Sequence, residues 1–297
     1  MKIQANGIEI EVEDSGADGG QADRPAVMLV MGLGMQLITW PPAMLRGLAQ
    51  AGYRVIRHDN RDIGLSARMA HLGRPSLLWE GLKFNAGVKV RAPYSLQDMA
   101  DDALGVLDAL GVAQAHLVGV SMGGMIAQRM AISAPERVRS LASVMSSSGE
   151  RSLPKASPRV QMALLGKPSG RNEDAVVCHY IRMFQIIGSP GFRQPDKAIE
   201  ARVRESVRRC YYPEGVARQT LASLGDIDRA EALSRIRAPT LVLHGKDDPL
   251  VPYACGVDTA RRIPGARMEG LAGMGHDLPP PVVDWMLSQL LPHLAAA

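Results

Sequence analysis

The sequence predicts an α/β fold, in which a mostly parallel sheet carries helices on both faces and a helical cap is inserted between two strands. Three observations support this class. Short apolar runs alternate with segments whose apolar residues recur at helical spacing, as in a parallel sheet covered by helices. The alternation breaks over residues 147–232 and then resumes. A length of 297 residues with 46% hydrophobic residues suits one large core.

The first elements read as an antiparallel hairpin followed by a buried strand. Residues 3–13 carry alternating apolar side chains around Asn6-Gly7, a preferred hairpin turn. Residues 26–31 are all apolar, as expected of a strand that is buried on both faces of a parallel sheet. A helix over 41–51, with a proline near its start, and a strand over 53–57 follow.

The middle of the chain predicts an irregular stretch, a helix and further strands. Residues 67–94 hold several glycines and prolines, with a short helix near 77–84. Ser95 and Asp98 resemble a capping box, and the apolar spacing after them predicts a helix that ends at Gly111. Buried strands are expected at 115–118 and 138–144.

The strand and helix alternation returns after the cap, where elements are expected at 239–244 (strand), 257–262 (helix), 266–268 (strand) and 281–291 (helix). Residues 1–146 and 233–297 are therefore predicted to form one α/β core, and residues 147–232 an inserted helical cap. A separate carboxyl-terminal domain is the alternative, and the returning alternation argues against it.

Composition and charge exclude several classes of protein. The formal net charge is +4, and basic residues are interleaved with acids, which argues against nucleic-acid binding. There is no apolar run long enough for a transmembrane helix, so we expect no membrane partner. The amino terminus lacks the apolar core of a secretory signal, and three cysteines without metal-ligand spacing favour a reduced, cytoplasmic compartment. No metal-binding or phosphate-binding motif is present, so no cofactor is expected.

Residues 119–123, Gly-Val-Ser-Met-Gly, fit the pattern G-x-S-x-G between a predicted strand and a predicted helix. In that order the motif forms a nucleophile elbow, with Ser121 on a strained turn. Side chains at 119 and 123 would collide with neighbouring backbone, which explains both glycines. The helix directs its first N–H groups and its positive dipole end at any oxyanion beside the serine. A chance match is the alternative, and the flanking elements favour the elbow.

An acid and a histidine follow the serine, each after a later strand, where parallel sheets place their chemistry. His276 lies in a loop after the last strand, and neutral imidazole can accept the serine proton. A surface histidine after a glycine turn is the alternative. Asp247 and Asp248 compete for the acid that orients the imidazole, and the Asp248-Pro249 step favours Asp248, with Asp247 more exposed. Structural roles are expected for His58, His116 and His244.

Acyl transfer also needs two N–H donors aimed at the oxyanion. Met122, the residue after the nucleophile, is expected to supply one backbone N–H. The loop after an earlier strand supplies the other, and Leu33, between Gly32 and Gly34, is the expected donor. Because both donors are backbone groups, their side chains are free to vary.

Four segments carry motifs of a known family: Met31–Gly34 with Trp40-Pro41, Asp59–Ser66, Gly119–Gly123 and Gly273–Pro279. Over nearly its whole length the chain resembles the α/β-hydrolase superfamily, in particular capped carboxylesterases of the aclacinomycin methylesterase type. Enol-lactonases share much of this pattern. The resemblance implies Ser121, Asp248 and His276 as catalytic triad, with Leu33 and Met122 as oxyanion donors. Met31 stands where many relatives have histidine.

The residues and the resemblance together predict a serine hydrolase that cleaves a carboxylic ester through an acyl-enzyme intermediate. A small-molecule ester is the expected partner, and the sequence leaves open whether the chain forms a homo-oligomer. An enol-lactonase, a C–C bond hydrolase or an acyltransferase would use the same triad. A non-enzymatic ligand-binding module is a further alternative, which a complete triad disfavours. The aromatic residues of the cap are expected to shape an apolar pocket.

Overall fold

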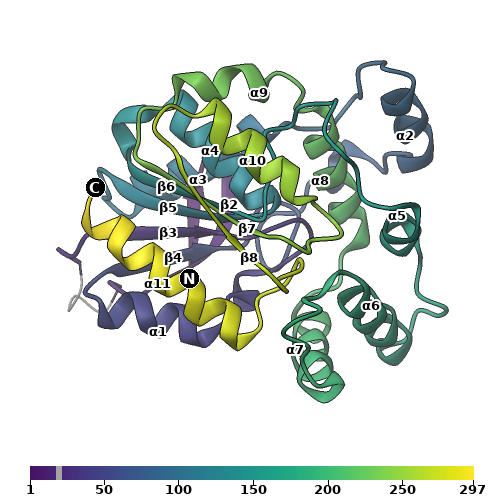
Figure 1. Ribbon diagram of the computed structural model, residues 1–297. Helices are drawn as coiled ribbons and strands as arrows, with labels where there is room; N and C mark the ends of the chain where they lie inside the picture. Colours follow the sequence, from purple (N-terminus) through teal and green to yellow (C-terminus); the bar gives the residue numbers. More distant parts are fainter. Residues whose placement is uncertain (18–21) are drawn as a thin grey trace.

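The computed structural model describes residues 1–17 and 22–297, and its strands form one eight-stranded sheet of order β1-β2-β4-β3-β5-β6-β7-β8 (Figure 1). Strands β1 and β2 pair antiparallel, β2 joins β4 antiparallel, and all later neighbours are parallel. The predicted α/β fold with a mostly parallel sheet is therefore confirmed. The strands are β1 Lys2–Ala5, β2 Ile8–Asp14, β3 Ala26–Val30, β4 Arg54–His58, β5 Ala115–Val120, β6 Val138–Val144, β7 Thr240–Gly245 and β8 Arg267–Leu271.

Helices cover both faces of this sheet (Figure 1). Helices α1 (Pro42–Gln50) and α11 (Pro280–Ala295) pack together on one face. Helices α3 (Leu96–Ala109), α4 (Met122–Ser133) and α10 (Tyr253–Arg262) lie on the other face. Alternate residues of the apolar strand β3 enter different cores: Met28 packs with the α3 and α4 side, and Leu29 with the α1 and α11 side. A strand whose two faces each contact a hydrophobic core has no polar face.

One turn and one helix start have the local structure that the sequence predicts. Asn6 and Gly7 have φ of 48° and 76°, the positive values that a two-residue hairpin turn requires. Both hydrogen bonds of the capping box between Ser95 and Asp98 are present at the start of α3. One boundary differs: α10 begins at Tyr253, four residues before the expected start, because Pro252 occupies its N-cap position.

Residues 147–232, called here the cap segment, hold α5 (Pro158–Leu165), α6 (Glu173–Ile187), α7 (Asp196–Arg209), α8 (Pro213–Gly225) and α9 (Arg229–Ala232). In Figure 1, helices α5 to α7 lie beyond the sheet on the right, below α2 (Leu77–Asn85). Helices α6 and α7 share a small apolar cluster of their own, centred on Val177, Ile199 and Val203. Within the described residues, no helix has both the length and the apolar character that crossing a membrane requires.

Candidate active site

Ser121 stands on a strained turn between β5 and α4. Its φ of 57° and ψ of −120° are unusual for a residue with a side chain. A Cβ at Gly119 would lie 2.2 Å from the Gly123 carbonyl oxygen, and a Cβ at Gly123 would lie 2.0 Å from the Val30 carbonyl oxygen. Both glycines of the motif are therefore needed for backbone to approach backbone, as the sequence predicted.

The structure brings together the three side chains that the sequence singled out. His276 Nε2 lies 3.0 Å from Ser121 Oγ, and His276 Nδ1 lies 2.7 Å from Asp248 Oδ2. The Asp248 side chain is fully buried, and that of His276 is 8% exposed. A continuous line of hydrogen-bonding groups thus joins a serine, an imidazole and a buried carboxylate, which is the geometry of an activated nucleophile.

The surroundings of Asp248 hold its carboxylate in one orientation. Oδ1 accepts the backbone N–H groups of Leu250 and Val251, both at 2.9 Å, which leaves Oδ2 facing His276. His244 Nε2 lies 2.8 Å from the Val251 carbonyl oxygen and 3.7 Å from Asp248 Oδ2. Because a carbonyl only accepts, Nε2 of His244 carries the proton and presents a donor to the same loop.

Asp247, the competing acid, has another position. It is exposed, and its Oδ2 accepts the Gly273 N–H at 2.6 Å, 26 residues along the chain. The exposure agrees with the expectation from the sequence. Asp247 therefore contacts the start of the loop that carries His276 and not the imidazole itself.

The loop after β3 approaches the serine closely. A Cβ at Gly32 would lie 3.2 Å from the Ser121 Cβ, so this loop passes directly beside the elbow. The Met35 N–H donates to the Gly32 carbonyl at 3.2 Å across a turn in which Gly34 has φ of 69°. Leu33 occupies this turn, and Met122 is the first residue of α4, where backbone N–H groups have no partner within the helix. The two expected donors thus flank Ser121 from different elements.

The sequence did not predict the hydrogen bonds between the cap segment and the loop that carries His276. The His276 N–H donates to the Ile187 carbonyl at 2.7 Å, and the Gly275 N–H donates to Ser189 Oγ at 2.9 Å. Ser189 in turn donates through Oγ at 2.5 Å and through its N–H at 2.8 Å to Asp277 Oδ1. The end of α6 therefore fixes both sides of His276. The only sequence feature that points to these contacts is the content of glycine and other small residues at 187–191.

Helix α8 is bound to the loops on the other side of the site. Gln219, fully buried, accepts the Gly34 N–H at 2.9 Å and donates to the Arg61 carbonyl at 2.8 Å. Arg218 makes two bonds to Asp62, at 2.7 and 2.8 Å, with 1% and 0% of these side chains exposed. The turn expected to hold an oxyanion donor is therefore braced by a helix of the cap segment.

Three histidines outside the contact chain, His58, His116 and His244, are buried. Burial lowers the pKa of His58 to about 4, and that of His116 to about 4, so both are neutral structural residues near pH 7. Burial also lowers the pKa of His244. Tyr180 and Phe184 of the cap segment are partly buried and pack against the small cluster between α6 and α7.

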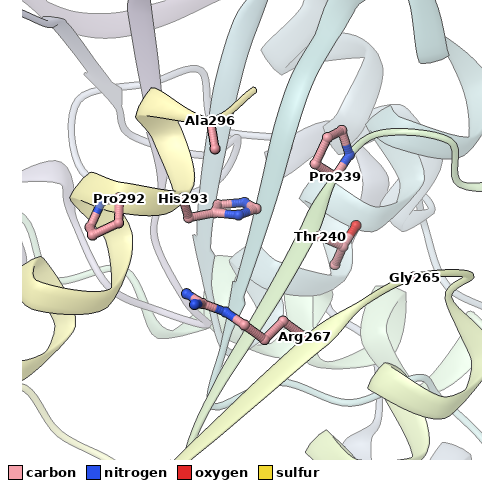
Figure 2. A pocket seen from close by; sticks show the side chains of 7 residues that line it. All are labelled: Pro239, Thr240, Gly265, Arg267, Pro292, His293 and Ala296. Carbon is pink, nitrogen blue, oxygen red and sulfur yellow. The ribbon is translucent and has the colours of Figure 1, made fainter.

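A hollow of about 260 Å³ lies away from these groups, between α11 and the amino ends of β7 and β8 (Figure 2). Arg267 of β8 and His293 of α11 line it, and burial lowers the pKa of His293. Ser121, by contrast, follows the carboxyl end of β5. Since parallel sheets carry their chemistry at the carboxyl ends, the hollow is not part of the candidate site. Among the described residues, no group of three His, Cys, Asp or Glu side chains is arranged to hold a metal ion.

Comparison with known proteins gives similar proteins over the whole chain. The profile of a family described as "alpha/beta hydrolase fold" matches residues 25–176. Rhodomycin D methylesterase DauP of Streptomyces sp. (strain C5) is 30% identical over 301 residues, covering 94% of this chain and 93% of that protein. A 2-hydroxy-6-oxononadienedioate/2-hydroxy-6-oxononatrienedioate hydrolase of Burkholderia vietnamiensis is 27% identical over 283 residues, covering 93% and 88%. Among solved structures, the meta-cleavage product hydrolase CumD of Pseudomonas fluorescens IP01 has a TM-score of 0.75 at 20% identity, with 100% and 97% coverage.

Proposed function

Since the chain belongs to the α/β-hydrolase family, we propose that it is a serine hydrolase that cleaves a carboxylic ester through an acyl-enzyme intermediate. The observation that carries the proposal is the unbroken Ser121, His276 and Asp248 contact chain, with distances of 3.0 and 2.7 Å. The methylesterase at 30% identity supports an ester as the substrate class. A methylesterase hydrolyses its ester to methanol and a carboxylic acid. This reaction needs no protein group beyond these three side chains and two N–H donors.

The acylation step uses each group at a stated atom. The His276 Nε2 takes the proton of the Ser121 hydroxyl as Oγ attacks the ester carbonyl carbon. The N–H groups of Leu33 and Met122 donate to the oxyanion that forms, and they are held in place before the reaction. Asp248 accepts the Nδ1–H of His276 and stabilises the imidazolium. The imidazolium then protonates the departing alkoxide, which leaves as the alcohol.

Deacylation repeats the sequence with water. His276 Nε2 removes a proton from water, whose oxygen attacks the acyl carbon, and the same two N–H groups hold the second oxyanion. Collapse returns the proton to Ser121 Oγ and frees the carboxylic acid. The division of the chain into an α/β core (1–146 and 233–297) and a cap (147–232) belongs to this proposal, because the cap segment supplies the contacts that hold Gly275 and Gly34.

A test compares hydrolysis of p-nitrophenyl butyrate by the purified protein and by Ser121→Ala. Turnover should fall by about 10⁴- to 10⁶-fold in the variant, as for loss of a triad nucleophile. Ser133→Ala, an exposed serine at the end of the same helix α4, is the matched control and should keep full activity. A fluorophosphonate should label the wild type and Ser133→Ala, and leave Ser121→Ala unlabelled. Equal turnover in wild type and Ser121→Ala would reject the nucleophile.

A second candidate is hydrolysis of a carbon–carbon bond, favoured by the similarity to the Burkholderia vietnamiensis hydrolase. It would use the same three side chains and differ in the electrophile presented to them. Parallel panels of methyl esters and of vinylogous diketone acids separate the two. A kcat/KM at least 100-fold higher for the diketone acids would replace the ester assignment. Ser121 would keep its place in the site.

A further inference from the structure

Two helices at the outer end of the molecule leave large apolar side chains in solvent. On α2, Leu78, Trp79 and Leu82 are 79%, 59% and 55% exposed, and their spacing places them on one side of the helix. On α5, Met162 and Leu165 are 68% and 67% exposed and lie three residues apart. Adjacent exposed apolar side chains of this size mark surfaces that bind something.

The segment that leads into α5 contacts the end of α2. Arg151, which precedes α5, donates to the Gly87 carbonyl at 3.1 Å just after α2, and its guanidinium stands 5.4 Å from the centre of the Phe84 ring. Lys155 lies 5.1 Å from the same ring. Figure 1 shows α2 and α5 together at the outer side of the molecule, beyond α8 and the carboxyl ends of the strands. We call the exposed faces of residues 77–91 and 151–171 the α2–α5 surface.

Basic residues dominate these two stretches. Glu80 is the sole acid between Asp62 and Asp98, and it is buried and paired with Lys83 at 2.6 Å. No acid occurs between Glu150 and Glu173. Residues 77–91 and 151–171 hold eight Lys and Arg residues against one acid, a net charge of +7 that exceeds the +4 of the whole chain, so the remainder is net negative. The basic charge is thus concentrated around the exposed apolar faces, in contrast to the interleaving over the cap segment as a whole.

We propose that the α2–α5 surface docks on an anionic lipid surface. Leu, Met and Trp side chains on two short helices enter the boundary between headgroups and acyl chains, while Lys and Arg extend to the phosphates. A second copy of this chain is a poor occupant, because a symmetric contact would bring two basic surfaces together. The proposal departs from the expectation that the chain has no membrane partner. Docking of this kind needs no spanning helix and is independent of the chemistry at Ser121.

Flotation of the full chain with vesicles tests the proposal. The protein should float with phosphatidylcholine vesicles that contain phosphatidylglycerol, float weakly with phosphatidylcholine alone, and detach at high salt. Trp79 is a built-in reporter, since its fluorescence should shift to the blue on binding and the shift should vanish in Trp79→Phe. Lys89→Gln/Lys167→Gln should lower the partition coefficient about 25-fold, because each basic residue near an anionic surface contributes about fivefold.

Matched variants distinguish vesicle binding through the α2–α5 surface from nonspecific adsorption by other faces of the protein. Leu78→Ser/Leu165→Ser should lose vesicle binding while its thermal midpoint stays within about 2 °C of wild type, since both side chains are exposed. Val257→Ser, 45% exposed on α10, and Arg46→Gln, exposed on α1, should bind like wild type. Absence of wild-type flotation with phosphatidylglycerol would overturn the proposal, as would unchanged binding by the Leu78/Leu165 or Lys89/Lys167 variants. Self-association that these variants abolish, without vesicle binding, would assign the surface to a second copy.

Discussion

Replacing Ser189 with alanine should weaken the hold of α6 on the loop that carries His276. Ser189 is 2% exposed, and its Oγ accepts the Gly275 N–H at 2.9 Å while donating to Asp277 at 2.5 Å. Alanine leaves the buried Gly275 N–H without an acceptor, which costs about 1–3 kcal/mol. Asp277 loses the hydroxyl but keeps the Ser189 backbone N–H at 2.8 Å and Gln194 Nε2 at 3.3 Å, so its carboxylate retains two donors.

This loss of free energy should appear as lower stability, as lower turnover, or as both. If His276 keeps its position, the free energy of unfolding falls by the full amount, and the thermal midpoint falls by about 2–4 °C per kcal/mol. If the loop shifts to find another acceptor, His276 Nε2 leaves its position 3.0 Å from Ser121 Oγ. A displacement of about 1 Å at reacting groups can lower kcat about 100-fold, with KM little changed.

Two measurements on the same samples separate these outcomes: thermal unfolding, and p-nitrophenyl butyrate hydrolysis normalised to the fraction labelled by a fluorophosphonate. Ser152→Ala is the control, because Ser152 is an exposed serine of the same cap segment, distant in sequence from Ser189. An unchanged midpoint together with an unchanged kcat in Ser189→Ala would refute the reasoning. Equal losses in Ser152→Ala would refute it as well.

Three further predictions concern other parts of the structure. Gly123→Ala should yield little folded or active protein, because its Cβ would lie 2.0 Å from the Val30 carbonyl oxygen, and soluble protein with wild-type kcat would contradict that packing. Arg218→Leu should lower the free energy of unfolding in denaturant by about 3–5 kcal/mol, since it leaves the Asp62 carboxylate buried and unpaired. The double variant with Asp62→Asn should recover part of the loss, and no recovery would argue against an unpaired charge as the cause. Burial lowers the pKa of His58 to about 4, so between that value and about 6.5 the unfolded chain binds more protons than the folded one, and stability falls as the pH drops through this window. The thermal midpoint of wild type should therefore fall more steeply between pH 7 and pH 4 than that of His58→Gln, and parallel curves would exclude His58 as the source.

Features set by neighbouring residues were predictable from the sequence. The Asn6-Gly7 turn needs positive φ at both positions, and the Ser95 and Asp98 cap joins residues three apart. The preference for Asp248 over Asp247 follows from similarly local information, since proline after Asp248 restricts the backbone there. Strand β6, Val138–Val144, begins and ends at the predicted residues.

Contacts between distant segments could not be predicted in the same way. Ser189 and Asp277 are 88 residues apart, and Asp62 and Arg218 are 156 apart, so no local pattern relates them. The aromatic side chains show a related difficulty. Tyr180 lies in the cap segment, whose aromatic residues are expected to shape a pocket, and the sequence does not show that it also packs against the apolar cluster shared by α6 and α7. Which use an apolar residue serves depends on the neighbours that the tertiary fold provides.

Helix α8 has a consequence for exchanging parts between relatives. By chain order it belongs to the cap segment, but its partners are Gly34, Arg61 and Asp62 of the core. A chimera that transplants residues 147–232 as one block would import a foreign α8 without the loops that match it. A graft whose second junction falls between α7 and α8 would keep this helix with its native partners. The segment that can be exchanged between relatives to alter substrate range is therefore shorter than residues 147–232. Helix α8 should stay with the core of its own chain.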